Sequence, residues 1–275
     1  MATKRLRLSE EKANLITRLS DANVAKLLTI LEDGHLYDIP APDARPVRYP
    51  DPFTGGDPAN VLIVGDNHEP DSLPGYLEWC RSEQERWNCG TVVFIGDLAN
   101  LASFSYHEKD PNLPGPAGEL ALLKEAVKKP FHMFTNVKWM LGNHDLLLAR
   151  KAFSAGLTTE MVRSLPEVLD MPTTWTAGMS FEQDNVFYHH GGSGGDAFRY
   201  AINSGKSTVQ GHLHTRAFVQ YSSSRHRQIF GMQVGCGIDF SKRSFDYARA
   251  NPVDPTIGCG VVLGGKVAIN LLMPR

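Results

Sequence analysis

Residues 60–68 read Asn-Val-Leu-Ile-Val-Gly-Asp-Asn-His, a short apolar run that stops at a glycine. The run is rich in β-branched residues, and it places Asp66 and His68 directly after its end. In an α/β protein, a buried strand of this kind presents polar side chains at its carboxyl end, where ligands bind. The stretch therefore predicts a strand that carries candidate ligands at its tip.

The same pattern recurs four times downstream. The further predicted strands cover residues 91–95, 137–141, 185–188 and 207–210. Each leads into residues of metal-binding type beside a glycine, where the backbone must turn sharply and approach a ligand closely. The candidate ligands from all five strands are Asp66, His68, Asp97, Asn143, His190, His212 and His214.

Seven candidates exceed what one ion needs. Carboxylate, imidazole and amide oxygen together suit Mn²⁺, Fe or Zn²⁺ better than Mg²⁺ or Ca²⁺ alone. Two ions that share a bridging carboxylate, roughly 3.5–4 Å apart, would use such a set. We expect two divalent ions, Mn²⁺ first, with Fe, Zn²⁺ or Ni²⁺ as alternatives.

The order of the predicted elements indicates an α/β fold. Helices around residues 73–86, 118–128, 146–155 and 196–203 alternate with the strands, whereas the tail alternates short strands and turns at 217–221, 228–234, 260–263 and 266–271. Helices early and hairpins late favour two packed sheets with helices outside them.

The chain divides into three predicted parts. Residues 1–34 form a helical prefix, residues 35–58 a proline-rich linker or strap, and residues 59–275 the main domain. For the prefix, we weighed a helix-turn-helix DNA reader against an amphipathic segment for packing or self-association. The second interpretation is favoured because no basic residues lie on a second helix, so we expect a homo-oligomer through these helices as one option.

Composition limits the function classes. The formal net charge of −2 gives no general electrostatic footprint for nucleic acid and argues weakly against long duplex DNA. The four cysteines show no C-x-x-C spacing and are typical of reduced thiols. The N-terminus lacks the apolar segment of a signal peptide, and no apolar run has membrane-spanning length. We therefore expect a soluble, cytoplasmic protein without a membrane partner.

The motifs resemble those of a known family. Gly65-Asp-Asn-His68, Gly96-Asp97, Gly142-Asn-His-Asp145, His190-Gly191 and Gly211-His-Leu-His214 match in type and order the five motifs of the calcineurin-like metallophosphoesterase superfamily. The compact build is similar to stand-alone members found on bacteriophage and bacterial genomes. The resemblance implies a four-layer α/β/β/α sandwich.

The resemblance also implies which metal ion each candidate ligand would bind and which residue would act as the general acid. Two ions would be bound, the first by Asp66, His68 and His214, the second by Asn143, His190 and His212, with Asp97 bridging them. A hydroxide between the ions would attack phosphorus, and His144 would protonate the leaving alkoxide as general acid.

The last residue of the third motif and the histidine before the fourth motif have expected roles of their own. Asp145 is expected to orient the His144 imidazole and raise its pKa. His189 and His190 are adjacent, and successive strand residues point to opposite faces, so one of them should reach a metal. The family pattern favours His190. Outside the motifs, His107, His132 and His226 are interpreted as ordinary surface or core histidines.

The class of phosphoester follows from a departure in the second motif. Ser/Thr protein phosphatases continue it as Gly-Asp-x-Val-Asp-Arg-Gly, whereas this chain has Gly96-Asp-Leu-Ala-Asn-Leu-Ala102 and lacks the arginine that grips a phosphomonoester. The sequence therefore favours a phosphodiesterase whose substrate is a nucleotide or nucleic acid. A phosphomonoesterase acting on nucleotides or small metabolites and a non-catalytic metal-binding scaffold are the alternatives. Arg199 and Lys206 are candidate phosphate-binding residues, with solvated surface positions as the competing interpretation.

Overall fold

The computed structural model describes residues 49–106, 110–192, 195–248 and 252–274. The predicted helical prefix and residues 35–48 of the predicted linker lie outside the described residues. The three-part division and self-association through the prefix therefore remain predictions.

The first sheet contains the strands that carry the first three motifs. Its six strands lie in the order β11-β10-β1-β2-β3-β4. Strands β1 to β4 run parallel, β10 pairs antiparallel with β1, and β11 pairs antiparallel with β10. The strands are β1 (Asp57–Val64), β2 (Cys89–Phe94), β3 (Val137–Met140), β4 (Trp175–Gly178), β10 (Gly258–Leu263) and β11 (Val267–Leu272).

The second sheet carries the last two motifs, which supply histidines. Its five strands lie in the order β5-β6-β7-β9-β8, with β6, β7 and β9 parallel and β5 and β8 antiparallel at the edges. The strands are β5 (Ser180–Gln183), β6 (Val186–His189), β7 (Ser207–Gln210), β8 (Phe218–Ser223) and β9 (Gln228–Gln233).

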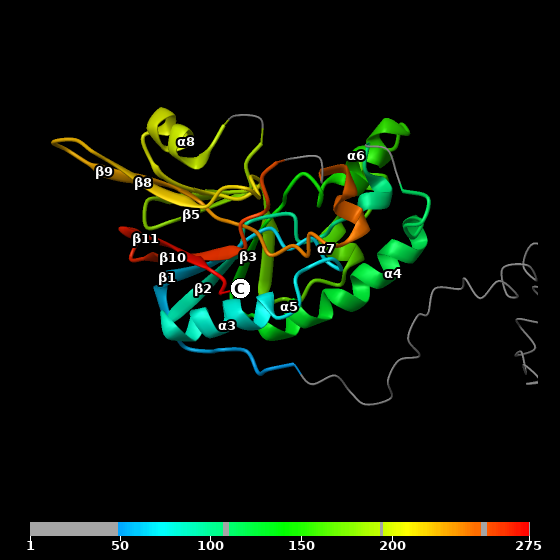
Figure 1. Ribbon diagram of the computed structural model, residues 1–275, viewed down its shortest axis with the longest axis horizontal. Coiled ribbons are helices and arrows are strands. Elements are labelled where there is room, and N and C mark those ends of the chain that lie inside the picture. Colours follow the sequence, from blue (N-terminus) through cyan, green and yellow to red (C-terminus); the bar gives the residue numbers. More distant parts are fainter. Residues whose placement is uncertain (1–48, 107–109, 193–194, 249–251, 275) are drawn as a thin grey trace, which may run out of the picture. The chain divides into compact units, whose positions relative to one another are not determined.

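Helices cover the outer faces of the two sheets (Figure 1). Helix α3 (Tyr76–Arg86) packs on β1 and β2, and α8 (Ala197–Ser204) packs on β7 and β9. The other helical segments are α4 (Pro116–Ala126), α5 (Lys128–Met133), α6 (Leu147–Ser154), α7 (Leu165–Val168), η1 (Ala102–Phe104), η2 (Thr159–Met161) and η3 (Arg243–Ala248). This arrangement confirms the predicted α/β fold with two sheets and helices outside them.

Strict alternation of side chains along β1 separates two apolar cores. Leu62 and Val64 point toward the helices and join one buried cluster, while Val61 and Ile63 point toward the second sheet and join another. The second cluster includes Tyr188 of β6 and other residues of the second sheet. The β1 run is apolar throughout because both of its faces are buried, which is typical of a parallel strand between two layers.

The fold contains short elements that the sequence analysis does not predict, among them α7 and the segments η1, η2 and η3. Strands β4 and β5 were not predicted, because each is four residues long and half exposed and so lacks a clear apolar pattern. The helix expected over residues 118–128 is followed by a separate helix, α5. Pro130 fits in the first turn of α5, where its missing N–H leaves no helical hydrogen bond unmade.

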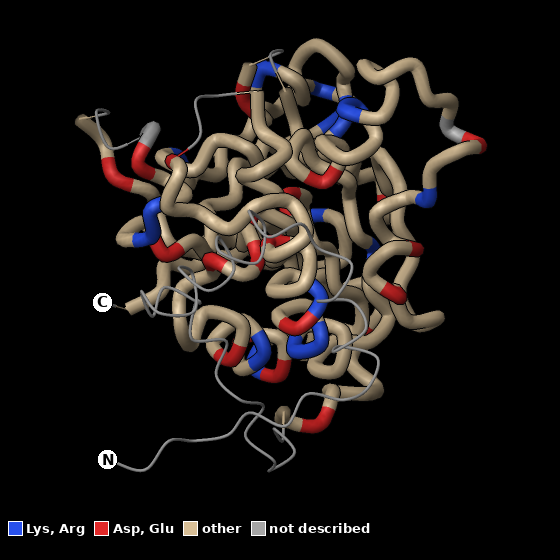
Figure 2. The backbone as a smooth tube through the Cα atoms, turned by 90° about the vertical axis from the view of Figure 1, so that its right-hand side faces the viewer, with Lys and Arg blue, Asp and Glu red and all other residues tan. Residues whose placement is uncertain are grey.

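Charged residues of both signs are interspersed over the face in Figure 2. This distribution agrees with the small net charge and gives that face no extended area of one sign. In the described part of the chain, no helix combines the length and apolar character needed to cross a membrane. The cytoplasmic location stays a prediction.

Replacing Ile63 by Ala should lower the free energy of unfolding by about 2–5 kcal/mol, because Ile63 is fully buried between the two sheets and its loss leaves a cavity. Ile202→Ala is the matched control, since Ile202 lies 45% exposed on α8, and it should change stability by less than about 0.5 kcal/mol. Urea unfolding of both variants measures the difference. Equal effects would contradict the packed inter-sheet core.

Candidate metal centre

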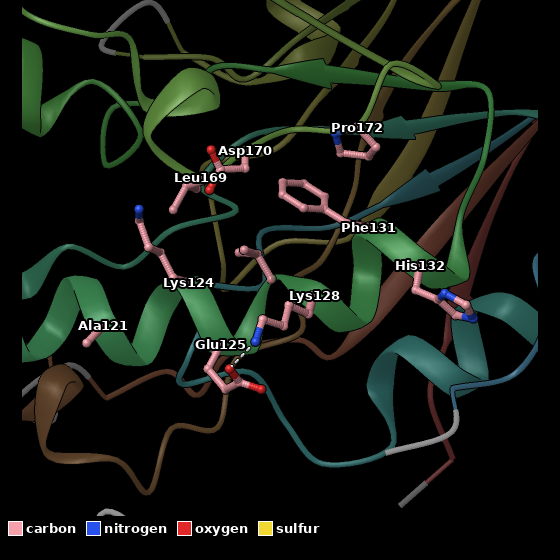
Figure 3. A pocket seen from close by; sticks show the side chains of 10 residues that line it. Ala121, Lys124, Glu125, Lys128, Phe131, His132, Leu169, Asp170 and Pro172 are labelled. Carbon is pink, nitrogen blue, oxygen red and sulfur yellow. Dashed lines mark hydrogen bonds and ion pairs between the residues drawn. The ribbon is translucent and has the colours of Figure 1, made fainter. Parts of the chain in front are cut away.

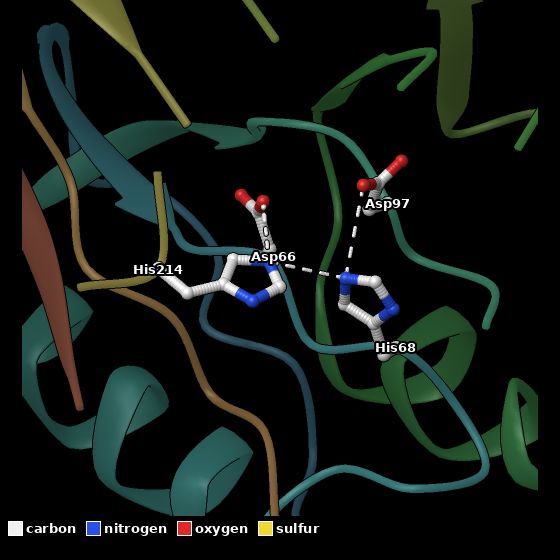
Figure 4. A group of neighbouring side chains, drawn as sticks. All are labelled: Asp66, His68, Asp97 and His214. Carbon is white, nitrogen blue, oxygen red and sulfur yellow. Dashed lines mark hydrogen bonds and ion pairs between the residues drawn. The ribbon is translucent and has the colours of Figure 1, made fainter. Parts of the chain in front are cut away.

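Four side chains converge beyond the carboxyl ends of the parallel strands (Figure 4). One atom each from Asp66, His68, Asp97 and His214 lies within 4.8 Å of the others, a group that could hold a metal ion. The His214 Nε2 lies 3.1 Å from the Asp66 Oδ2 and 3.2 Å from the His68 Nε2. The His68 Nε2 in turn lies 3.7 Å from the Asp97 Oδ2.

A second group shares Asp97 with the first. Asp97, His190 and His212 also offer ligand atoms within 4.8 Å of one another. The His190 Nε2 lies 3.2 Å from the Asp97 Oδ2 and 3.0 Å from the Asn143 Oδ1, so the Asn143 amide belongs to this group as well. The structure thus brings together all seven candidate ligands, with Asp97 at the centre.

The backbone at these strand ends is bent to aim the side chains. His68, Asp97 and His212 have φ angles of 49°, 48° and 70°, in the left-handed region that costs free energy for residues other than glycine. Adjacent glycines permit close approach. A Cβ on Gly142 would collide with the Asp97 carboxylate, and one on Gly211 would collide with Asp66. Strain of this kind, held in place by tight packing, is common at functional sites.

The donor set fits divalent cations. The Asp66 Oδ1 is buried and has no hydrogen-bond partner within the described part of the chain, although buried polar atoms are normally paired. The ring nitrogens of His68 and His214 face each other at 3.2 Å, so they need a proton or a cation between their lone pairs. Carboxylate and imidazole ligands of this type suit transition-metal ions.

The charges of the site are balanced by histidine. Burial alone would raise the pKa of Asp97, but the His190, His144 and His68 imidazoles outweigh burial and hold that pKa well below its usual range. Burial likewise opposes a charge on His190, yet the Asp97 and Asp66 carboxylates raise its pKa to about 10. Protonated His190 can donate from its Nδ1 to the Ile95 carbonyl oxygen at 3.1 Å and from its Nε2 to Asp97.

The opposite pKa shift occurs at His68. Burial first, and then repulsion from the His144 imidazole, lowers its pKa well below the usual value. Burial followed by repulsion from His190 also lowers the pKa of His212. Neutral imidazoles are the form that binds metal ions.

The structure places His190, and not His189, in the candidate metal centre. The His189 ring points to the other face of the second sheet, where it packs 4.5 Å from the ring of Tyr200 on α8. Burial lowers the pKa of His189 to about 4. The alternation of side chains along β6 produces this separation.

The Asp145 carboxylate has hydrogen-bond partners other than the His144 imidazole, which it is expected to orient. The Asp145 carboxylate accepts hydrogen bonds from the backbone N–H groups of Ala99 and Gly142 and from the indole of Trp139 at 2.9–3.1 Å. It therefore joins the loops after β2 and β3, and burial, reinforced by the Asp97 charge, raises its pKa to about 6. Asp145 stabilises the loops on which the candidate ligands lie.

His144 lies at the edge of the cluster. Its backbone N–H donates to the Asp97 Oδ1 at 2.8 Å, and its Nδ1 contacts the Asn100 carbonyl oxygen. Its ring stands edge-on to His68, with the centroids 4.5 Å apart. When Nδ1 donates to that carbonyl, Nε2 is the ring nitrogen left to exchange a proton with a ligand.

Asn100 is a residue of the site that was not among the candidates predicted from the sequence. Its Oδ1 lies 3.2 Å from the His68 Nδ1. The signal in the sequence was a polar residue in the otherwise apolar stretch 98–102, three positions after Asp97. Its meaning depends on a contact across 32 residues of chain, which periodicity does not reveal.

Lys206, His226 and His132 have surroundings other than the cluster. The ammonium of Lys206 pairs with Glu182 at 2.8 Å, and His226 is exposed on the turn between β8 and β9. His107 lies outside the described residues. A hollow of about 500 Å³ between α4, α5 and residues 169–172 includes His132 and contains none of the candidate ligands (Figure 3).

Comparison with protein families agrees with the geometry. A model of the calcineurin-like phosphoesterase family matches residues 59–220, more than half of the chain. This range contains all the candidate ligands and confirms the resemblance in the motifs. The sequence has no significant match among curated proteins.

Several solved structures resemble the chain at low identity. YfcE, a phosphoesterase from E. coli, is 18% identical, with 78% of this chain and all of that chain covered and a TM-score of 0.38. A Vps29 single mutant from Entamoeba histolytica is 12% identical (78% and 99% covered, TM-score 0.34). The nuclease MPE from Pseudomonas putida is 13% identical (74% and 84% covered, TM-score 0.33). Scores in this range establish neither a shared substrate nor a shared partner.

Loading the metal-free protein with Mn²⁺ at pH 7 should release about one proton per chain, because His190, whose pKa is raised to about 10, must lose its proton before its Nε2 binds an ion. Apparent affinity should therefore increase as the pH rises toward that value. Titration calorimetry in two buffers of different protonation enthalpy counts the protons. His226→Ala should leave the number unchanged, and a heat of binding that does not depend on the buffer would contradict this account of His190.

Proposed function

Because the chain belongs to the calcineurin-like phosphoesterase family, we propose that it is a dinuclear metal-dependent phosphodiesterase acting on nucleotide or nucleic-acid phosphodiesters. The family and the cluster of carboxylates and imidazoles support a metal-dependent phosphoesterase. The preference for diesters over monoesters is the more specific part of the proposal, and it depends on the charges around the cluster.

The observation that supports a preference for diesters is the lack of a basic side chain among the described contacts of the cluster. In the described ranges, no Lys or Arg side chain forms a hydrogen bond or ion pair with a candidate ligand. Leu101 stands where Ser/Thr phosphatases have their arginine, and it is buried in the apolar core beneath the first sheet. A phosphomonoester dianion has one more negative charge than a diester, so a site without that arginine favours the diester.

The candidate ligands would divide between two ions. Asp66, His68 and His214 would hold one ion, Asn143, His190 and His212 the other, and Asp97 would contact both. We expect Mn²⁺ as the best activator, with Fe, Zn²⁺ or Ni²⁺ as alternatives, because borderline ions accept this mixture of oxygen and nitrogen ligands. Such ions, when bound, supply Lewis-acid stabilisation of the phosphoryl group and activate water.

The chain itself supplies the proton for the leaving group. His144 lies beside both groups of ligands, and its backbone N–H is fixed on Asp97. With its Nδ1–H held by the Asn100 carbonyl, the doubly protonated ring can give the proton on its Nε2 to the departing alkoxide and become the neutral Nδ1–H form. A non-catalytic scaffold would have no use for an imidazole held in this way, so we favour the enzyme.

Bis(p-nitrophenyl) phosphate should be hydrolysed faster than p-nitrophenyl phosphate after the protein is stripped of metal and reloaded with Mn²⁺, Ni²⁺, Zn²⁺ or Mg²⁺. Steady-state kcat/KM for both substrates measures the preference. Asp97→Ala should abolish both activities, since both groups of ligands depend on that carboxylate. A faster monoester reaction would favour the phosphomonoesterase, and absence of turnover with two bound ions would favour the scaffold.

His144→Ala should lower kcat for a dinucleotide by about 10²–10⁴-fold, because a nucleoside alkoxide needs a proton to depart. The loss should be much smaller for bis(p-nitrophenyl) phosphate, since p-nitrophenolate leaves without protonation. Comparison of kcat for the two substrates tests this, with His226→Ala as an exposed-histidine control. Equal losses on both substrates would show that His144 does not act as the general acid.

A further inference from the structure

A chain of hydrogen bonds leads from His68 to the tail of the protein. The His68 Nδ1 lies 3.2 Å from the Asn100 Oδ1, and the Asn100 Nδ2 donates to the Asp71 Oδ2 at 2.8 Å. The same oxygen accepts a hydrogen bond of 2.7 Å from the Ser244 hydroxyl. His68, Asn100 and Ser244 are buried, so water does not readily replace these partners.

The direction of each hydrogen bond follows from the carboxylate. A carboxylate accepts hydrogen bonds and does not donate them, so the Asn100 atom that faces Asp71 must be the NH₂ group. The opposite end of the amide, which faces His68, is therefore the carbonyl oxygen. An oxygen accepts, and so the Nδ1 of His68 must carry the hydrogen.

This assignment determines what the other ring nitrogen can do. Neutral imidazole has one N–H, so a hydrogen on Nδ1 leaves a lone pair on Nε2. The His68 Nε2 is the atom that faces His214 and Asp97 in the first group of ligands. The tautomer fixed by Asn100 is thus the one that can bind a metal ion on that side.

We propose that Asn100, held by Asp71 and Ser244, is a positioning residue that fixes His68 as the Nδ1–H tautomer and thereby keeps its Nε2 available for a divalent cation. The inference deepens the proposed function, because it rests on His68 being a metal ligand. Partners of the second ring nitrogen commonly control both the orientation and the basicity of a metal-binding histidine.

Backbone hydrogen bonds hold this chain of side chains, which we call the relay, in place. The Asp71 N–H donates to the His68 carbonyl oxygen at 2.8 Å, and the Asp71 carbonyl oxygen accepts from the Asp239 N–H at 2.9 Å. The ring of Phe245, next to Ser244, stands edge-on to His68 at 5.6 Å. Ring rotation of His68 is therefore opposed by packing as well as by the hydrogen bond.

The test uses the full chain in its metal-free form and two readouts other than turnover. Two-bond ¹⁵N–¹H correlation spectra of the histidine rings report the tautomer of His68, and calorimetry with Mn²⁺ reports affinity. In Asn100→Leu, which keeps the size but removes both polar atoms, the Nδ1–H form should no longer dominate. Affinity for one ion should fall by about 10- to 100-fold.

A reciprocal exchange separates positioning from packing. In the double variant Asn100→Asp with Asp71→Asn, the carboxylate introduced at position 100 would accept from both the His68 ring and the amide introduced at position 71. The contact between positions 100 and 71 is thus kept with donor and acceptor exchanged, and the Ser244 hydroxyl would accept from the introduced amide where it donates to Asp71 in the wild type. The Nδ1–H tautomer and most of the affinity should return. Asn60→Leu is the matched control, since Asn60 lies in the middle of β1 and donates to the Trp87 carbonyl oxygen, and it should change neither readout.

Each outcome counts for or against the relay. Wild-type tautomer and affinity in Asn100→Leu would overturn the inference, and so would an exchange variant that folds but does not recover them. If Asn100→Leu fails to fold, Ser244→Ala, which removes the hydroxyl on the far side of Asp71, should still weaken Mn²⁺ binding; unchanged binding would count against the relay. Wild-type protein that shows the Nδ1–H tautomer and binds Mn²⁺ but cleaves no phosphoester would overturn the proposed function and leave this inference standing.

Discussion

The carboxylate of Asp97 is the centre on which the site depends. It is buried, and it accepts a hydrogen bond from the His144 backbone while the imidazole of His190 lies against its other oxygen. A buried charge without such partners would be strongly unfavourable. The positions of the surrounding groups are thus set by the need to compensate this one charge, first by histidine and, when ions are bound, by metal.

Compensation of the Asp97 charge requires the two sheets to pack against each other in one fixed arrangement. The first sheet supplies Asp66, His68, Asp97 and Asn143 from the ends of three parallel strands. The second sheet supplies His190 after β6 and His212 and His214 beyond β7. The apolar layer between the sheets fixes the distance between these two sets of side chains. Packing of the core therefore has a direct consequence for the geometry of the candidate metal centre, since close-packed interiors transmit small displacements.

The histidines differ in pKa and in role because their surroundings differ. His190 faces two carboxylates and has a raised pKa, whereas His68 is buried among other imidazoles and has a lowered one. His189, one residue away from His190, lies under α8 and takes no part in the cluster. The environment, and not the residue type, thus decides which imidazole carries a proton before a metal ion binds.

Local apolar runs and glycines were enough to predict the α/β class, the main strands and the five ordered motifs, because these signals act over a few residues. The sequence by itself also named all seven side chains that the structure brings together. The short edge strands β4 and β5, the partners of Asp145 and the contact between Asn100 and His68 were decided by tertiary structure. Residues 71 and 244 are 173 positions apart along the chain, and no local pattern encodes such a meeting. It exists because the packing of two sheets brings their loops to one edge.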